Sequence, residues 1–503
     1  MLFKELRKKC FVALFLAPVM VCLLSGLLMA GQGMAKEAKY VFLMIGDGMG
    51  IPQRAAAEQY IGEKLLMDTL PAQGVTTTHA ANRYITGSAP AATAMASGQK
   101  TNIGVVGMDP QLRPVKTLAE LAKEQGMKVG IVSSVSIDHA TPAAFYAHVP
   151  KRGQYYDIDV ALAESGFDYF GGGGLKDPTN ERDNSQNYRG NALEMAKDNG
   201  YSIVTDKDEF LGLSKGAGKV LASNEWLQDS KALPYDMDRR SQDISLAEFT
   251  KKGIELLDND DGFFMMVEGG KIDWACHAND GKASIQDTLA FDEAVREAYA
   301  FYQEHPEETL LVVTGDHECG GMTLGFAGTK YATNFEVLSK QNVSFQKFSA
   351  DILAELKESK SQVAFKDVKP LITKHFGLKF DAEGSDLMAL KSHEVITIME
   401  AFERSMAGDV EMSKDPETYL LYGGYEPLTV TLTHILNQKA GLAWTSYKHT
   451  GVPVTTSAVG VGAEAFNGSY DNTDIGLKIM DTMGLVSEVQ YAEQDEDVLV
   501  ADN

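Results

Sequence analysis

The stretch YVFLMIGDGMG at residues 40–50 decides the fold. An unbroken apolar run of this length is typical of a strand that is covered on both faces, because a half-exposed strand alternates apolar and polar residues. The run ends on Asp47, and the glycines that follow let a ligand approach the backbone closely. We therefore predict a buried strand at 40–46 that presents a functional carboxylate at its end.

The same pattern recurs along the chain and alternates with helical patterns. Further strands are predicted at 128–134, 201–205, 219–223, 262–269, 309–316 and 454–460, and helices at 115–125, 189–199, 244–258, 282–304 and 472–484. This order predicts an α/β fold in which helices sandwich a largely parallel central sheet. Residues 325–440 break the pattern with amphipathic helices that no parallel strand separates, which predicts an inserted helical cap.

The composition restricts the partners. The 503 residues include 46 Lys and Arg against 70 Asp and Glu, for a formal net charge of −24. Such acidity disfavours nucleic acid and anionic membranes as partners. An anionic substrate would need a locally positive site, which bound cations can supply.

The N-terminus has the parts of a secretory signal. The basic segment MLFKELRKKC precedes the apolar run FVALFLAPVMVCLLSGLLMA, and small residues follow at Gly33 and Ala35. We predict a signal peptide at 1–35 and a mature domain at 36–503 that is exported to the periplasm or secreted, free of the membrane after cleavage. The alternative is a signal anchor, because an apolar run of this length could span a bilayer.

Two cysteines, Cys276 and Cys319, remain after the predicted cleavage. Two cysteines in a chain of this size are no disulfide framework. They could form one bridge in an oxidising compartment, or they could be two separate buried thiols.

Other predicted strands also end on polar residues. FFMMVEGG places Glu268 at the end of one strand, and LLVVTGDHECGG places Asp316 and His317 at the end of another. Because the carboxyl ends of parallel strands share one edge of a sheet, where ligands bind, we expect these side chains to converge with Asp47.

The segment DWACH adds a pair of metal ligands. Asp273 and His277 are four residues apart, so on a helix they lie on one face, and His449 stands shortly before the last predicted strand. Oxygen and nitrogen ligands suit zinc, and three protein ligands leave one coordination position of the ion open for water or substrate. Each residue alone could be a helix cap or a hydrogen-bond partner. Together with the strand ends, they predict a site for several metal ions.

Ser88 opens the alanine-rich run in TGSAPAATAMAS at residues 86–97. A serine at this position is a common helix N-cap. The same place suits a nucleophile, because the free N–H groups and dipole of a helix N-terminus favour an anion, and a neighbouring metal ion would stabilise the serine alkoxide. Arg152 could hold two phosphate oxygens at once, or it could be a solvated surface cation.

The ordered motifs resemble those of the alkaline phosphatase family. They are D-G-x-G, S-A-x-x-A-T-A, D/H-A-T-P-A-A…R, V-E-G-x-x-I-D-x-x-x-H, D-H and H-T-G, and the resemblance covers about 39–152, 262–322 and 445–465. It implies zinc-dependent hydrolysis of small phosphate monoesters at alkaline pH through a phosphoserine, and a homodimer. The implied site consists of Ser88 as phosphoryl acceptor, Arg152 as phosphate clamp, one Zn²⁺ on Asp273, His277 and His449, a second Zn²⁺ on Asp47, Asp316 and His317, and Mg²⁺ on Asp47, Thr141 and Glu268.

Three positions depart from the family pattern. Gly87 stands where many members have an aspartate that orients the arginine, which predicts a more mobile Arg152. His139 stands where some members have Asp, and Trp274 stands where others have Lys or His. Both are expected to flank the third metal site, so the identity of that ion stays open. The rival interpretations are a sulfatase or phosphodiesterase of the same superfamily and a metal- or phosphate-binding protein without turnover. Ala92 stands where the sulfatase motif requires arginine.

Overall fold

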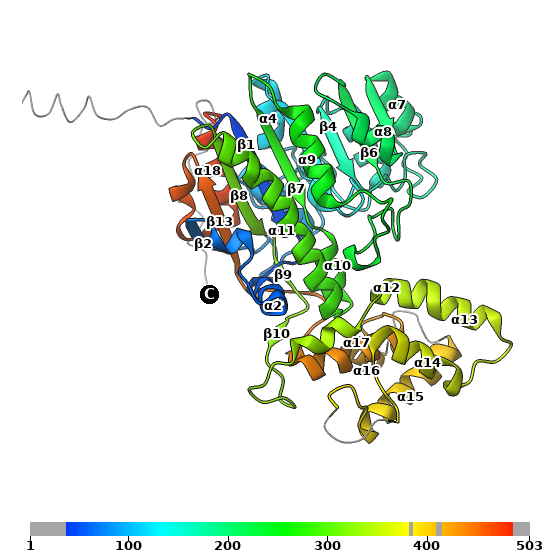
Figure 1. Ribbon diagram of the computed structural model, residues 1–503. Helices are drawn as coiled ribbons and strands as arrows, with labels where there is room; N and C mark the ends of the chain where they lie inside the picture. Colours follow the sequence, from blue (N-terminus) through cyan, green and yellow to red (C-terminus); the bar gives the residue numbers. More distant parts are fainter. Residues whose placement is uncertain (1–36, 382–385, 409–414, 486–503) are drawn as a thin grey trace, which may run out of the picture.

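The computed structural model describes residues 37–381, 386–408 and 415–485 (Figure 1). Its centre is a ten-stranded sheet. In spatial order the strands are β14 (Gly468–Asp471), β2 (Ala72–Thr77), β13 (Val454–Gly460), β8 (Thr309–Gly315), β1 (Tyr40–Gly46), β7 (Phe263–Glu268), β3 (Lys128–Ser133), β4 (Tyr169–Gly172), β6 (Lys219–Ser223) and β5 (Tyr201–Val204). β13 pairs antiparallel with β2 and β8, and every other neighbouring pair of this sheet is parallel. The predicted α/β class is confirmed.

Side chains of the central strand alternate between two hydrophobic layers. In β1, Phe42 and Met44 enter one buried cluster, whereas Leu43 and Ile45 enter the other. Burying each such side chain stabilises the fold by about 1.5–3 kcal/mol, which explains why an uninterrupted apolar run is needed here.

Helices cover both faces of the sheet. They are α2 (Ile51–Ile61), α3 (Ser88–Ser97), α4 (Leu118–Glu124), α5 (Ala140–Ala143), α6 (Tyr155–Glu164), α7 (Ala192–Asp198), α8 (Lys207–Gly212), α9 (Leu246–Leu257), α10 (Lys271–His277), α11 (Gly281–Glu304) and α18 (Asn472–Thr482). The cluster that contains Phe42 also contains Phe249 of α9 and Phe291 of α11. The opposite cluster contains Met95 of α3 and Ile475 of α18.

The segment 325–440 is helical and lies below the end of the sheet in Figure 1, in yellow to orange. Its helices are η3 (Phe335–Lys340), α12 (Phe345–Lys347), the π-helix η4 (Phe348–Leu353), α13 (Ala354–Ser359), α14 (Phe365–Phe376), α15 (Ser392–Ala407), α16 (Pro416–Tyr422) and α17 (Pro427–Ala440). We call this segment the cap. Asp280, at the start of α11, accepts hydrogen bonds from Gln341 Nε2 and from the Phe345 N–H, and so ties the cap to the body.

The predicted signal peptide lies outside the described residues. Among the helices that the structure describes, none is both long enough and apolar enough to cross a bilayer.

Candidate active site and metal centre

Four neighbouring strands bring the predicted polar residues to one edge of the sheet. β8, β1, β7 and β3 lie side by side in this order. Asp316 and His317 follow β8, Asp47 follows β1, and Glu268 is the last residue of β7. The chain after β3 leads to α5, which carries Thr141. Residues far apart in sequence thus meet in one buried region, as the parallel order of the strands requires.

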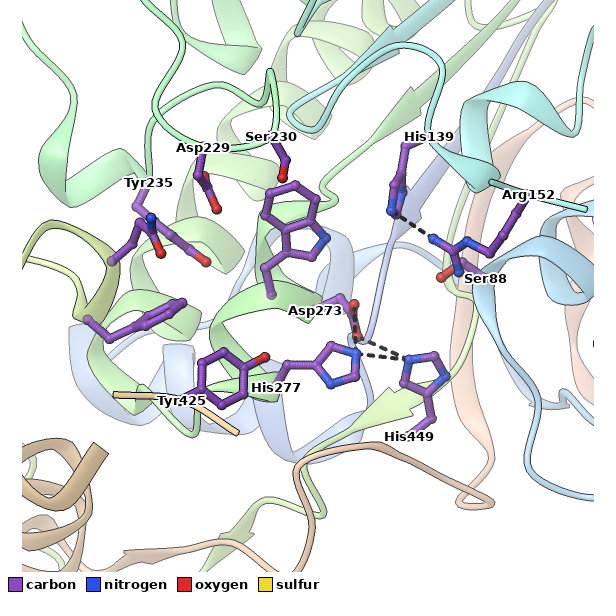
Figure 2. A pocket seen from close by; sticks show the side chains of 13 residues that line it. Ser88, His139, Arg152, Asp229, Ser230, Tyr235, Asp273, His277, Tyr425 and His449 are labelled. Carbon is purple, nitrogen blue, oxygen red and sulfur yellow. Dashed lines mark hydrogen bonds and ion pairs between the residues drawn. The ribbon is translucent and has the colours of Figure 1, made fainter. Parts of the chain in front are cut away.

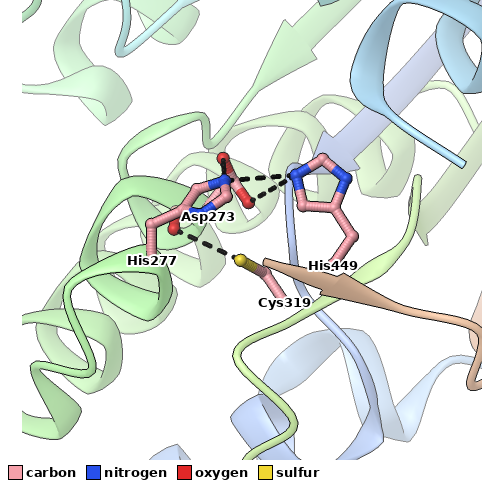
Figure 3. Close-up of side chains that lie close together, drawn as sticks. All are labelled: Asp273, His277, Cys319 and His449. Atoms are coloured by element: carbon pink, nitrogen blue, oxygen red, sulfur yellow. Dashed lines mark hydrogen bonds and ion pairs between the residues drawn. The ribbon is translucent and has the colours of Figure 1, made fainter. Parts of the chain in front are cut away.

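Asp273, His277 and His449 form the first group of candidate metal ligands (Figure 3). The Nδ1 atoms of the two histidines face backbone carbonyls, that of Tyr447 at 2.6 Å and that of Thr86 at 2.9 Å. Because a carbonyl can only accept, each Nδ1 carries a proton and leaves the lone pair of Nε2 for another partner. The two Nε2 atoms are 3.2 Å apart, and both face the Asp273 carboxylate, at 3.3 and 3.6 Å. A cation between them would satisfy all three side chains.

Asp47, Asp316 and His317 form the second group, and all three are fully buried. His317 Nε2 lies 3.4 Å from Asp47 Oδ1 and 3.3 Å from Asp316 Oδ2. Asp316 Oδ1 accepts hydrogen bonds from the N–H groups of Gly48 and His317, which fixes the orientation of the carboxylate. Both oxygens of Asp47 and Oδ2 of Asp316 lack a hydrogen-bond partner.

Around Glu268 lies a third group, which is rich in oxygen atoms. Ser133 donates to Glu268 Oε2, whereas Oε1 has no hydrogen-bond partner, and neither has Thr141 Oγ1. Asp47, His139 and Glu268 offer ligand atoms that lie within 4.8 Å of one another. His139 is therefore within reach of this group. The hydroxyl of Ser133 orients the Glu268 carboxylate, and the sequence analysis did not identify this serine.

The carboxylates of the second and third groups resist ionisation when no cation is near. Burial and the charge of Asp316 raise the pKa of Asp47 well above its usual range. Burial raises the pKa of Glu268 to about 7, and burial together with nearby carboxylates raises that of Asp316 to about 8. Buried carboxylates that lack partners are costly unless cations neutralise them, so the residues present fit bound metal ions.

Asp273 behaves in the opposite way. Burial opposes its ionisation, but the imidazoles of His277 and His449 outweigh that effect and hold the pKa of this carboxyl well below its usual range. The first group therefore carries an ionised carboxylate beside two histidines at neutral pH, a donor set that suits zinc.

Ser88 is the first residue of α3, and it does not cap the helix. The N-cap is Gly87, and no side-chain hydrogen bond closes this helix end, so the N-cap interpretation of Ser88 is wrong. The Ser88 hydroxyl instead lies 3.5 Å from His317 Nε2, next to the second group. The start of α3 therefore places the hydroxyl, almost fully buried, beside the candidate metal ligands.

Arg152 is held although Gly87 supplies no carboxylate. Its guanidinium donates to His139 Nε2 at 2.7 Å (Figure 2). Burial and the positive charge of Arg152 lower the pKa of His139 well below its usual range, so the imidazole is neutral and can accept this hydrogen bond. His139 thus orients the arginine. The prediction of a more mobile Arg152 rested on Gly87 alone and did not include this hydrogen bond.

Ser88 and Arg152 lie at a cavity of about 300 Å³ (Figure 2). Its walls also contain His139, Asp273, Trp274, His277 and His449, which the sequence analysis named, and Asp229, Ser230, Tyr235, Phe345, Gln346 and Tyr425, which it did not. The residues that were missed belong to irregular segments, where no motif marks them, and to the cap, where an amphipathic pattern predicts helices but does not show which side chains reach the cavity.

Cys276 and Cys319 are both free and buried, so the interpretation as two separate thiols is confirmed. Cys319 Sγ lies near the first ligand group and donates to the backbone carbonyl of Asp273 at 3.7 Å (Figure 3). Burial raises the pKa of the Cys319 thiol well above its usual range. In the absence of a metal ion this thiol is therefore protonated, whereas Asp273 of the same group is ionised.

Glu318 fixes the loop that carries His317. It is 1% exposed, and its carboxylate accepts from Gln53 Nε2, from the N–H groups of Gly321 and Met322, and from the Thr450 hydroxyl. Thr450 belongs to β12 (His449–Thr450), which pairs with β9 (Glu318–Cys319). Glu318 therefore connects the strand of His449 to the loop of His317.

We expect Glu318→Ala to destabilise the protein by about 3 kcal/mol, because several buried donors would lose their acceptor. The His449 strand would loosen, so zinc affinity should fall as well. Urea denaturation and equilibrium dialysis against zinc measure the two effects. The matched control is Glu63→Ala, an exposed carboxylate in the turn that follows α2, which should change neither quantity. Unchanged zinc affinity in Glu318→Ala would contradict the positioning role.

The fold and the buried ligand groups place the chain among the metal-binding hydrolases. A sequence model described as Alkaline phosphatase matches residues 38–485. The chain belongs to the alkaline phosphatase family and is a phosphomonoesterase.

Individual relatives agree with the family match. Alkaline phosphatase 4 of Bacillus subtilis (strain 168) is 32% identical over 465 residues, which cover 89% of each protein. The solved cold-active alkaline phosphatase of the psychrophile Shewanella sp. has a TM-score of 0.72 at 28% identity, over 88% of this chain and 99% of its own. The Thermus thermophilus alkaline phosphatase has a TM-score of 0.74 at 25% identity, over 90% and 92% of the two chains.

Proposed function

We propose that the protein hydrolyses phosphate monoesters through a phosphoserine on Ser88, assisted by two Zn²⁺ and one Mg²⁺. The observation that carries the proposal is the Ser88 hydroxyl at 3.5 Å from His317 Nε2, because it places a nucleophile at a helix N-terminus beside a buried ligand group. No other role for the hydroxyl is apparent there, since it does not cap α3.

The donor chemistry supports the assignment of the ions. The two groups that contain histidine, Asp273 with His277 and His449, and Asp47 with Asp316 and His317, suit zinc. The oxygen atoms of Asp47, Thr141 and Glu268 suit Mg²⁺. When bound, these ions supply Lewis-acid stabilisation for the attacking and leaving oxygens.

The chain's own residues perform the remaining steps. Ser88 Oγ loses its proton and forms a bond to phosphorus as the bond between phosphorus and the ester oxygen breaks, and the ester oxygen leaves as the alcohol once it gains a proton. A water oxygen then bonds to phosphorus, the Ser88 Oγ–phosphorus bond breaks, Oγ regains a proton from the water, and inorganic phosphate is released. The guanidinium of Arg152 holds two phosphate oxygens, and His139 keeps that guanidinium in place. The N–H groups of the first turn of α3 and its dipole stabilise the negative charge.

Three nitrophenyl esters test the reaction class. The purified zinc- and magnesium-loaded protein is assayed at alkaline pH with p-nitrophenyl phosphate, bis(p-nitrophenyl) phosphate and p-nitrophenyl sulfate. We expect kcat/KM for the monoester to exceed the other two by about 100-fold or more, because one Arg152 and three ions match a dianionic phosphate. Faster hydrolysis of the diester or of the sulfate would favour one of those two activities instead. The metal-loaded protein acting on none of the three would contradict the proposal.

Two further predictions rest on the sequence and on the family alone. They are the homodimer and the export of the mature chain to the periplasm or the medium.

A further inference from the structure

The cavity extends from the Ser88 region along a row of aromatic rings (Figure 2). His139 contacts Trp274 with ring centroids 5.7 Å apart. Tyr235 contacts Phe345 at 5.5 Å, and Phe345 contacts Tyr425 at 5.7 Å, both edge to face. We call Trp274, Tyr235, Phe345 and Tyr425 the aromatic wall. All four line the same cavity as Ser88 and Arg152.

A buried lysine connects Trp274 and Tyr235, the two rings of the aromatic wall that come from the body. Lys271 is fully buried, and its Nζ lies 3.7 Å from the Tyr235 ring centroid and 4.8 Å from that of Trp274. The same Nζ pairs with Asp229 Oδ1 at 2.7 Å. Cation–π contacts and the ion pair fix the two rings before any ligand binds. Because Asp229 neutralises Lys271, this buried lysine adds no net charge to the wall.

The outer half of the aromatic wall comes from the cap. Phe345 begins the cap helix α12, and its N–H donates to Asp280 Oδ2 of the body at 2.8 Å. This hydrogen bond holds Phe345 against the body. Tyr425 lies between α16 and α17 and is only partly buried, so its ring stays accessible from the cavity. Tyr235 is fully buried and packs against Phe345, so it supports the wall, and Trp274, Phe345 and Tyr425 are the rings that can contact a ligand.

Resting on the proposed function, we propose that the aromatic wall is a leaving-group subsite that selects phosphate monoesters of alcohols bearing a planar aromatic ring. Arg152 and Ser88 fix the phosphate at one end of the cavity, so the alcohol portion extends along the wall. Aromatic rings stack edge to face or offset on such a surface. A cavity of about 300 Å³ accommodates an aryl or nucleoside group.

Matched substrate pairs test the subsite. Benzyl phosphate is compared with n-butyl phosphate, and adenosine 5′-monophosphate with ribose 5-phosphate, because both members of each pair release a primary alcohol. We expect the wild type to favour the aromatic member of at least one pair in kcat/KM. Tyr425→Leu and Phe345→Leu should each lower that preference by about 3- to 10-fold. A response of the first pair alone assigns the subsite to aryl groups, and a response of the second assigns it to nucleosides.

Tyr331→Leu is the control, because Tyr331 also belongs to the cap but is fully exposed. It should leave both preferences unchanged. Inhibition by inorganic phosphate should stay the same in all variants, since phosphate does not reach the aromatic wall. Equal kcat/KM within both pairs for the wild type, or preferences that neither cap variant changes, would overturn the subsite. Failure of the proposed function would give a different result, because the wild type would then hydrolyse neither n-butyl phosphate nor ribose 5-phosphate.

Discussion

Ser88→Ala is expected to lower the turnover of p-nitrophenyl phosphate by at least about 10³-fold while zinc remains bound. The substitution removes the only atom that could accept the phosphoryl group at this position. Ser88 belongs to none of the three candidate ligand groups, so the metal content should stay at the wild-type level. Release of p-nitrophenol at alkaline pH is measured together with metal content on the same samples.

Ser97→Ala is the matched control for this experiment. Ser97 is also buried and lies at the other end of α3, where its hydroxyl donates to the Thr93 carbonyl at 2.7 Å. It should retain activity, because its side chain stabilises only the helix. Activity near that of the wild type in Ser88→Ala would mean that this serine merely begins α3, and the covalent mechanism would then be wrong.

The sequence predicted the central strands because of a specific physical constraint. β1, β7 and β8 are covered on both faces, so their apolar runs are uninterrupted and their ends are marked by Asp47, Glu268 and Asp316. The convergence of these carboxylates follows from the parallel order of the strands. Helical spacing likewise sufficed for Asp273 and His277, which both lie on α10.

Three strands of the central sheet and the loop contacts were missed for equally physical reasons. β2 alternates buried and exposed residues, β4 ends in two glycines, and β14 is a short edge strand with exposed side chains, so none of them shows a continuous apolar run. The contact of Arg152 with His139 depends on how two loops pack. So does the aromatic wall, where Phe345 and Tyr425 reach the cavity from the cap. Such contacts have no local sequence signal.

Removal of the metal ions is expected to make stability depend on pH between about pH 6.5 and about pH 8. In the metal-free protein, the raised pKa values of Glu268, about 7, and Asp316, about 8, mean that the folded state holds protons that the unfolded state, with values near ~4, has released. The stability that these two carboxyls supply is fully present below about pH 4 and is lost as the pH rises to about 8, by up to ~1.4 kcal/mol per pH unit for each proton. Burial lowers the pKa of His139, His317 and His449, which has the opposite effect below about pH 6.5, so the net fall is expected above that pH.

The metal-loaded protein should lose this slope. Metal ions keep the carboxylates of the folded state deprotonated, and those of the unfolded chain are deprotonated as well, so these groups exchange almost no protons on unfolding. Urea denaturation of chelator-treated and zinc- and magnesium-loaded samples, at steps between about pH 6.5 and about pH 8, measures the two slopes. Stability should fall with pH in the metal-free protein and stay nearly constant in the metal-loaded protein.

Two variants identify the groups responsible for the slope of the metal-free protein. Asp316→Asn removes one titrating carboxyl from the buried region, so the metal-free slope should become shallower by about one proton. Asp261→Asn changes an exposed carboxylate at the other end of β7 and should leave the slope unchanged. If the metal-free and metal-loaded proteins had the same slope, or if Asp316→Asn had no effect on it, the buried carboxylates would not be the groups that the metal ions neutralise. In that case the cations would have to be bound elsewhere in the molecule, and the donor groups assembled around Asp47 would need another explanation.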